Sequence, residues 1–215
     1  MAKVNPAVEG TGNRQSAYIA RNRAALIRSA QRVLAESGLH ATTEQLATDA
    51  SVSPTTIYKY FESKDALLSE ALADAWQEFM LWAHGDEIPG SSFQGILNVF
   101  RKLLRAEKTH PQFARILENT LSDSSFVITA VRPLAMATLQ KAASKEDIAV
   151  DQFEERVYLW GFTLAGIMSG VYVAKELSPE KADEALAISL QVLDFSKAKA
   201  KKLVSQPLVY PEPKA

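Results

Sequence analysis

The sequence has no cysteine and only three histidines among its 215 residues. Without cysteine, disulfides, thiolate zinc sites and thiol nucleophiles are excluded. The histidines, His40, His84 and His110, do not have metal-ligand spacing, and no phosphate-binding glycine loop, zinc motif or nucleophile elbow is present. We therefore expect no metal, no cofactor and no enzymatic activity, although an enzyme that uses carboxylates alone stays an alternative.

Long hydrophobic runs are also scarce. Residues 157–174 form one stretch of eighteen residues without a charge, which is about the shortest length that can span a membrane. Gly161, Gly166 and Gly170 dilute its hydrophobicity, and no second stretch of this kind exists. A helix that is apolar on all sides is also typical of burial between two protein surfaces. We therefore favour a helix buried in a dimer over a membrane span.

The first twenty residues contain no continuous apolar segment of the kind that a secretory signal requires. We expect residues 1–20 to form a loose arm on a cytoplasmic protein. The arginines of this region, such as Arg14, Arg21 and Arg23, are compatible with phosphate contacts, but scattered arginines are more often simply solvated.

The net charge of −1 hides an asymmetry between the two ends of the chain. Residues 1–64 hold eight Lys and Arg against five Asp and Glu, a net charge of +3, whereas residues 65–215 hold sixteen against twenty, a net charge of −4. This excess of basic residues permits nucleic-acid binding without proving it, because binding depends on how charges cluster on one face.

The pattern of apolar residues and capping signals predicts helices throughout. Gly38 suits the end of a first helix, and Thr42 with Gln45 forms a capping box that opens a short second helix. Ser53 and Pro54 suit the cap and first turn of a third helix. Further helices are expected near 63–83, 92–107, 110–121, 124–144, 151–176 and 179–200, with a kink at Pro133 and a frayed tail over 207–215.

Two short helices that flank a tight turn match the order of a helix-turn-helix, whose second helix lies in the major groove of DNA. At 100° per residue, Ile57 and Phe61 fall on the core side of this helix. Thr55, Thr56 and Lys59 fall on the opposite side, where hydroxyl and ammonium groups can reach base edges and phosphates.

Residues 24–68 resemble the DNA-binding domain of the TetR family of bacterial repressors. The resemblance rests on two segments, TEQLA at 43–47 and VSPTTIYKYFESKDALL at 52–68. It implies base or groove contacts by Thr55, Thr56, Tyr58 and Lys59, and contacts to the DNA backbone by Thr43, Tyr60 and Lys64. Glu44 departs from the pattern, because some members place a basic DNA contact there.

The resemblance also implies an all-α fold with the helix-turn-helix over 21–64 and a helical ligand-binding and dimerisation domain over 65–206. In this family the last two long helices of two subunits form a four-helix bundle. The residues expected at this interface are Trp160, Gly166, Gly170, Leu186 and Leu190. The residues expected to line a pocket are Trp76, Phe79, Met80, Phe100, Met136, Tyr158 and Phe162, with Trp82, Trp160 and Met168 as further candidates.

The functional reading is a homodimeric repressor that binds a palindromic operator in double-stranded DNA. The uncharged helix over 157–174 favours a small apolar or aromatic effector that releases the DNA. Activation and ligand-independent DNA binding stay as alternatives within the regulator class. A helical adaptor is the rival outside that class, but an adaptor would not need an exposed polar face at 55–59.

Overall fold

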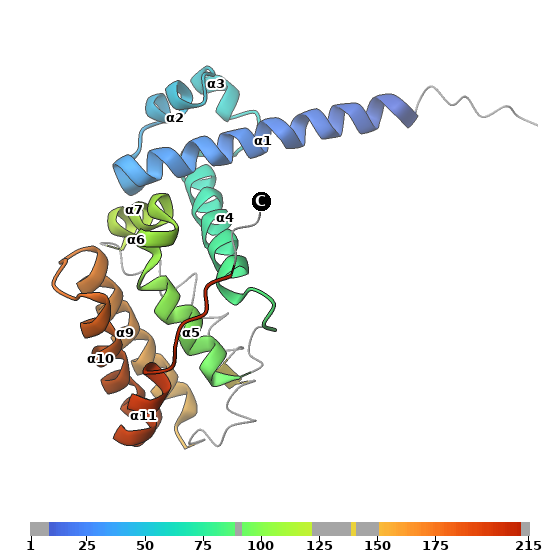
Figure 1. Cartoon of the computed structure of the whole chain (residues 1–215). Coiled ribbons are helices and arrows are strands. Elements are labelled where there is room, and N and C mark those ends of the chain that lie inside the picture. The colour runs from blue at the N-terminus through green and yellow to red at the C-terminus, as the bar shows by residue number, and fades with distance from the viewer. Residues whose placement is uncertain (1–8, 89–91, 122–138, 141–150, 212–215) are drawn as a thin grey trace, which may run out of the picture. The chain divides into compact units, whose positions relative to one another are not determined.

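The computed structural model describes residues 9–88, 92–121, 139–140 and 151–211. All regular elements within these ranges are helical (Figure 1). The chain divides into two compact units between Asp74 and Ala75, within the helix α4 (Lys64–His84). This division lies ten residues beyond the expected boundary at residue 64, because the first turns of α4 belong to the amino-terminal unit.

The first unit contains the predicted helix-turn-helix. Helix α1 spans Glu9–Ser37, α2 spans Thr43–Asp49 and α3 spans Pro54–Ile57, followed by the first part of α4. Gly38, with φ of 58°, follows α1 in the left-handed conformation that suits a residue without a Cβ. The capping box of Thr42 and Gln45 is present, so the local signals placed the start of α2 correctly.

Helix α1 corrects the expectation of a loose arm, since it is helical from Glu9 onward. The expectation relied on the absence of a continuous apolar segment in the first twenty residues, but such a segment is not required for a helix to form. No proline lies between Pro6 and Pro54, so every residue of this segment keeps the amide hydrogen that a helix uses.

Small and medium apolar side chains from all four helices fill the core of the first unit. The most deeply buried are Ala30, Leu34, Leu46, Ile57, Leu67, Leu68, Ala71 and Leu72. Polar groups at the edge are paired: the Gln31 side chain donates to the Ala71 carbonyl at 3.3 Å and to the Asp74 carboxylate at 2.9 Å. These bonds tie α1 to the first turns of α4.

The second unit comprises the rest of α4 and the helices that follow it. These are α5 (Phe93–Leu103), α6 (Ala106–Thr109), α7 (Pro111–Thr120), α9 (Phe153–Tyr172), α10 (Pro179–Ser189) and α11 (Lys197–Val204). The predicted helix over 124–144, with its kink at Pro133, lies outside the described residues except for Leu139 and Gln140.

Two of the predicted helices are each divided in the structure. The stretch 92–107 breaks between α5 and α6, where the buried Tyr172 hydroxyl donates to the Leu103 carbonyl and accepts from the Ala106 amide at 3.2 Å. Burial raises the pKa of this phenol, which keeps the donating proton in place. The stretch 179–200 ends at a left-handed Asp194, and Ser196 caps the separate helix α11.

The carboxy-terminal segment packs against its own unit as far as Pro211, which corrects the expectation of a frayed tail. The Gln206 carbonyl accepts from Arg101 Nη1 at 2.7 Å, and the Tyr210 ring lies 6.2 Å from that of Trp82. Pro211 lies against Gly85, where a Cβ would stand only 3.2 Å from its ring. The prolines of this segment prevent a helix, which suggested fraying. An extended backbone can nevertheless pack across helices when its side chains anchor it.

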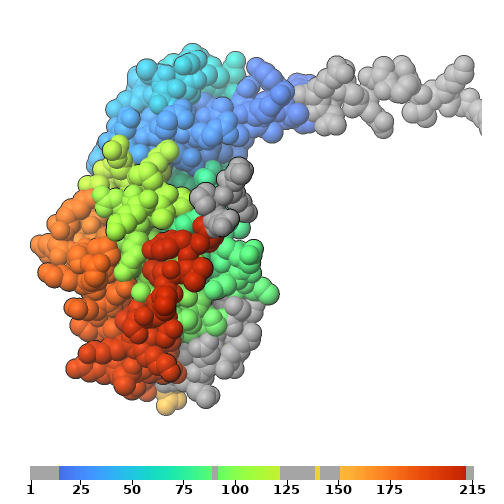
Figure 2. Space-filling model, in the orientation of Figure 1, coloured from blue at the N-terminus to red at the C-terminus, as the bar shows by residue number. Residues whose placement is uncertain are grey.

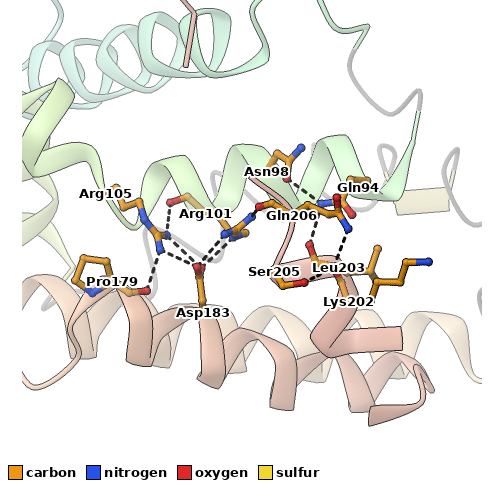
Figure 3. Close-up of polar contacts among 10 residues, drawn as sticks. All are labelled: Gln94, Asn98, Arg101, Arg105, Pro179, Asp183, Lys202, Leu203, Ser205 and Gln206. Carbon is orange, nitrogen blue, oxygen red and sulfur yellow. Dashed lines mark hydrogen bonds and ion pairs between the residues drawn. The ribbon is translucent and has the colours of Figure 1, made fainter. Parts of the chain in front are cut away.

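One carboxylate joins the main elements of the second unit (Figure 3). Asp183 on α10 accepts two bonds from Arg101, both at 3.0 Å, and two from Arg105, at 3.1 and 2.7 Å. Arg105 also donates to the Pro179 carbonyl at 3.1 Å. The Arg101 side chain is only 7% exposed and that of Asp183 16%, so these bonds are formed largely out of water.

A second cation on α5 is buried close by. Lys102 Nζ donates to the Ala83 carbonyl at 2.7 Å, in the last turn of α4. A cation at a helix carboxy terminus is favourable because the terminal carbonyls carry partial negative charge. Burial lowers the pKa of Lys102, and the charge of Glu87 opposes this shift.

We predict that Asp183→Asn lowers the free energy of unfolding of the second unit by about 3–5 kcal/mol, because it leaves two guanidinium groups in a buried site without a counter-charge. Urea unfolding followed by circular dichroism measures this change. Glu184→Gln on the exposed side of the same helix is the matched control and should change stability by less than about 0.5 kcal/mol. Equal losses in the two variants would contradict the role given to Asp183.

Candidate DNA-binding surface

The turn between α2 and α3 is held by its own backbone and by one side chain. Ser51 has a φ of 55°, and the Val52 amide donates to the Ala47 carbonyl at 2.9 Å, which closes the turn. The Ser53 hydroxyl then accepts from the Thr56 amide at 3.3 Å, with Pro54 in the first turn of α3. The sequence therefore sets the direction of α3 through the predicted cap.

The two sides of the segment 54–61 differ as the sequence predicted. Ile57 has no exposed surface and Phe61 is 5% exposed, so both anchor the segment in the core. Thr55 and Lys59 are exposed, and 53% of Tyr58 faces solvent. The outward face therefore presents a hydroxyl, an ammonium and a phenol above an apolar anchor.

Hydroxyl groups on this face are arranged by one another. Thr43 Oγ1 lies 3.3 Å from Tyr58 Oη, so the start of α2 and the exposed phenol meet. Thr56 Oγ1 lies 2.9 Å from the hydroxyl of Ser53, the capping residue. On this candidate DNA-binding surface the predicted contact residues Thr43 and Tyr58 thus meet, while Thr56 is oriented by Ser53.

Tyr60 and Lys64 lie at the edge of this surface. Tyr60 is half-buried, and its hydroxyl accepts from Asn22 Nδ2 at 2.9 Å. Lys64, in the first turn of α4, forms an ion pair with Asp65 at 3.5 Å and keeps 31% of its side chain exposed. Sequence reasoning missed Asn22, because nothing in its local pattern indicates a partner 38 residues away.

A carboxylate fixes α2 against α1 behind this surface. Asp49 accepts from Arg32 Nη2 and from the Ser29 hydroxyl, each at 2.6 Å. The hydrogen bond from Arg32 holds the pKa of Asp49 below its ordinary value, against the opposing effect of partial burial, and Ser29 adds to the lowering. Glu44, the residue that departs from the family pattern, is exposed in the first turn of α2.

The residues expected to line a ligand pocket do not form one group. Phe79 is 1% exposed and stacks on Phe113 at 4.9 Å, which makes it part of the core. Trp76, Met80 and Phe100 are half-buried. Tyr158 and Phe162 are 43% and 45% exposed, so they lie on the surface of α9. Met136 lies outside the described residues.

The residues expected at a dimer interface also need correction. Leu186 and Leu190 have no exposed surface and Trp160 is 2% exposed, so all three pack inside their own unit. A Cβ at Gly170 would come within 2.7 Å of Leu177, so this glycine serves the turn after α9. Gly166 alone of the five is open, with nothing within 4 Å of an added Cβ. The sequence pattern showed that this region is apolar but not which face of each helix its own unit covers.

The first unit has the helix order and the tight turn of a helix-turn-helix domain, and comparison with known proteins agrees with this fold. Residues 26–71 match the family model of bacterial regulatory proteins of the tetR family. No curated protein matches the chain. The matched segment lies within the first unit, and the match confirms the predicted resemblance of residues 24–68 to this family.

Solved structures share the fold along most of the chain. RolR in complex with resorcinol is 18% identical, with a TM-score of 0.66 over 90% of this chain and 98% of that one. RolR without ligand gives a TM-score of 0.63 at 19% identity, over 88% and 98% of the two chains. A TetR-like regulator from Rhodococcus sp. RHA1 gives 0.55 at 17% identity, over 81% and 97%. These likenesses confirm the predicted all-α, two-part fold.

The membrane alternative for residues 157–174 finds no support. Within the described part of the chain, no helix has the length and hydrophobicity that a membrane span requires.

Proposed function

We propose that the protein is a repressor that binds a palindromic operator as a homodimer and is released by a small aromatic effector. The observation that carries the DNA-binding part is the exposed polar face of 55–59 above the buried Ile57 and Phe61. In this proposal Thr55, Thr56, Tyr58 and Lys59 contact the bases and groove, and Thr43, Tyr60 and Lys64 contact the DNA backbone.

The division of roles follows from reach and chemistry. Tyr58 and Lys59 project from residues 54–61, which we call the reading segment, where a phenol and an ammonium can approach base edges. Tyr60 and Lys64 lie at its end, where a hydroxyl and a cation suit phosphate oxygens, which position the protein without reading sequence. The bond between Asn22 and Tyr60 reduces the freedom of the phenol before DNA arrives.

The proposed dimer surface is the exposed apolar face of α9, to which we add the exposed Ile188 of α10, the helix that packs against α9. On this face Tyr158, Leu159 and Phe162 are 43%, 55% and 45% exposed, and Ile188 is 67% exposed. Gly166 continues the same face one helical turn after Phe162 and leaves room for close helix approach. An exposed apolar patch of this kind is typical of a protein interface.

A two-fold dimer determines the form of the operator. It presents two reading segments on one side of the DNA, so half-sites about 34 Å apart, related by two-fold symmetry, are expected. A monomer has only one reading segment and makes half of the contacts, so monomers are expected to bind DNA weakly.

The effector is proposed to be a small aromatic molecule bound in the second unit. Two observations support this class: half-buried aromatic side chains such as Trp76 and Phe100 lie in that unit, and RolR, which shares the fold, is solved with resorcinol. Aromatic side chains favour planar apolar ligands through stacking and burial.

The first experiment selects duplexes from random DNA with the purified chain and sequences the bound fraction. We expect a palindromic motif with half-sites one helical turn apart. Tyr58→Ala should weaken discrimination within the motif by about 1–3 kcal/mol per contacted base pair, whereas Lys64→Ala should weaken all sequences alike and lower the salt slope by about 0.9 per protomer.

Lys201→Ala is the matched control for Lys64→Ala, because Lys201 is an exposed lysine on α11, in the other unit. It should leave the motif and the salt slope unchanged. The reading assignment fails if Tyr58→Ala selects the same motif with the same stringency as the unmodified chain.

For the dimer, Phe162→Glu should convert the protein to monomers in sedimentation velocity, because it places a charge in an apolar interface. Leu81→Glu is the control, since Leu81 is 66% exposed on α4, away from the proposed face. A Phe162→Glu variant that remains dimeric, or two variants that dissociate equally, would refute this interface.

For the effector, resorcinol is the first probe. Adding it to the complex of the protein with its selected operator should release DNA, as measured by fluorescence anisotropy, and cyclohexanol serves as a non-aromatic control. Release by both compounds alike, or by neither, would contradict a pocket selective for small phenols.

A further inference from the structure

The helix α1 carries an unusual charge pattern. Residues 10–35 contain five arginines and no acidic residue, although the whole chain is nearly neutral. In a loose arm these arginines would be scattered cations. Because this segment is helical, its geometry arranges Arg21, Arg23, Arg28 and Arg32 on defined faces of α1.

Two of these arginines are used within the first unit. Arg23 forms a two-pronged ion pair with Glu70 and lies over the Phe61 ring at 4.7 Å, while Arg32 pairs with Asp49. Arg21 and Arg28 are exposed, and no acidic residue among those described pairs with either. Their charges are therefore available to a partner.

Contacts on both sides of α1 establish which way Arg21 and Arg28 face. Arg32 reaches Asp49 on α2, and at about 100° per residue Arg21 and Arg28 lie within about 40° of its direction. Arg23, which reaches α4, points about 160° away from Arg21. The two free arginines thus share the side of α1 on which α2 and α3 lie (Figure 1).

The free arginines also adjoin the proposed DNA-binding surface. Asn22, next to Arg21 in sequence, donates to the hydroxyl of Tyr60 at the end of the reading segment. Before this point, residues 15–21 are all exposed, including Tyr18 at 58% and Ile19 at 45%. Figure 2 shows this part of α1 standing clear of the helix-turn-helix.

We infer that α1 is a second DNA-binding element, in which Arg21 and Arg28 hold the phosphate backbone beside each half-site. A polyanion is the partner that fits a helix with free arginines and no acidic residue over 10–35. The hydrogen bond from Asn22 to Tyr60 places this helix, and with it Arg21, next to the reading segment. This inference rests on the proposed DNA-binding function and extends its footprint.

The test compares the full chain with the double variant Arg21→Ala, Arg28→Ala on the selected operator between about 50 and 200 mM salt. Each lost phosphate contact reduces the slope of log affinity against log salt by about 0.9, so the slope should fall by about 1.8 per protomer. The selected motif should stay the same, because phosphate contacts carry no sequence information. The double lysine variant should restore the slope, since phosphate requires only the charge.

Arg115→Ala is the matched control, an exposed arginine on α7 in the second unit, and it should not change the slope. If the double alanine variant binds with the slope of the unmodified chain, α1 is not a DNA contact, while the proposed function stands. If the unmodified chain selects no motif but binds duplex DNA, the proposed function fails and the slope still decides the inference. A chain that binds no duplex overturns both.

Discussion

The second unit depends on the carboxylate of Asp183. The guanidinium groups of Arg101, on α5, and Arg105, between α5 and α6, converge on it, and Arg101 also donates to the Gln206 carbonyl beyond α11. Few other interactions could serve here, because arginine in bidentate geometry fixes both the distance and the angle of its partner. The helix α10 is therefore held in one register against α5, and the apolar side of α10 faces the core while Ile188 faces outward.

In the first unit, by contrast, short local motifs determine most of the backbone conformation. The reading segment has few residues of its own to bury, so its position depends on the Ser53 cap, the closed turn at Ser51 and the two anchors Ile57 and Phe61. The bond from Asn22 to Tyr60 attaches it to α1, and the pair of Arg32 with Asp49 attaches the preceding helix α2 to α1. A segment built in this way presents polar groups outward while the cap, the turn and the two anchors fix its position.

This contrast explains which features could be predicted from the sequence. The capping box of Thr42 and Gln45, the cap at Ser53 and the start of α10 at Pro179 are local signals, and each lies where the pattern placed it. The side of the reading segment that is buried also followed from helical periodicity.

The features that sequence reasoning missed depend on residues distant along the chain. Asp183 and Arg101 are 82 positions apart, and Tyr172 occupies the break between α5 and α6 from 66 positions beyond Ala106. The apolar composition of α9 and α10 indicated burial but not which surface provides it, so Leu186 and Gly170 were given to a partner when their own unit covers them. Helical periodicity identifies an apolar face but does not show whether the chain's own unit or a partner covers it.

The packing of residues 206–211 has a practical consequence for handling the protein. This segment reaches Arg101 through a carbonyl, Trp82 through a ring and Gly85 through a proline, so it touches both α5 and the last turn of α4. A purification tag or fluorescent fusion joined directly after residue 211 would pull on the helix that links the two units. A flexible glycine-serine spacer between the chain and the tag or fusion would let residues 206–211 keep their contacts.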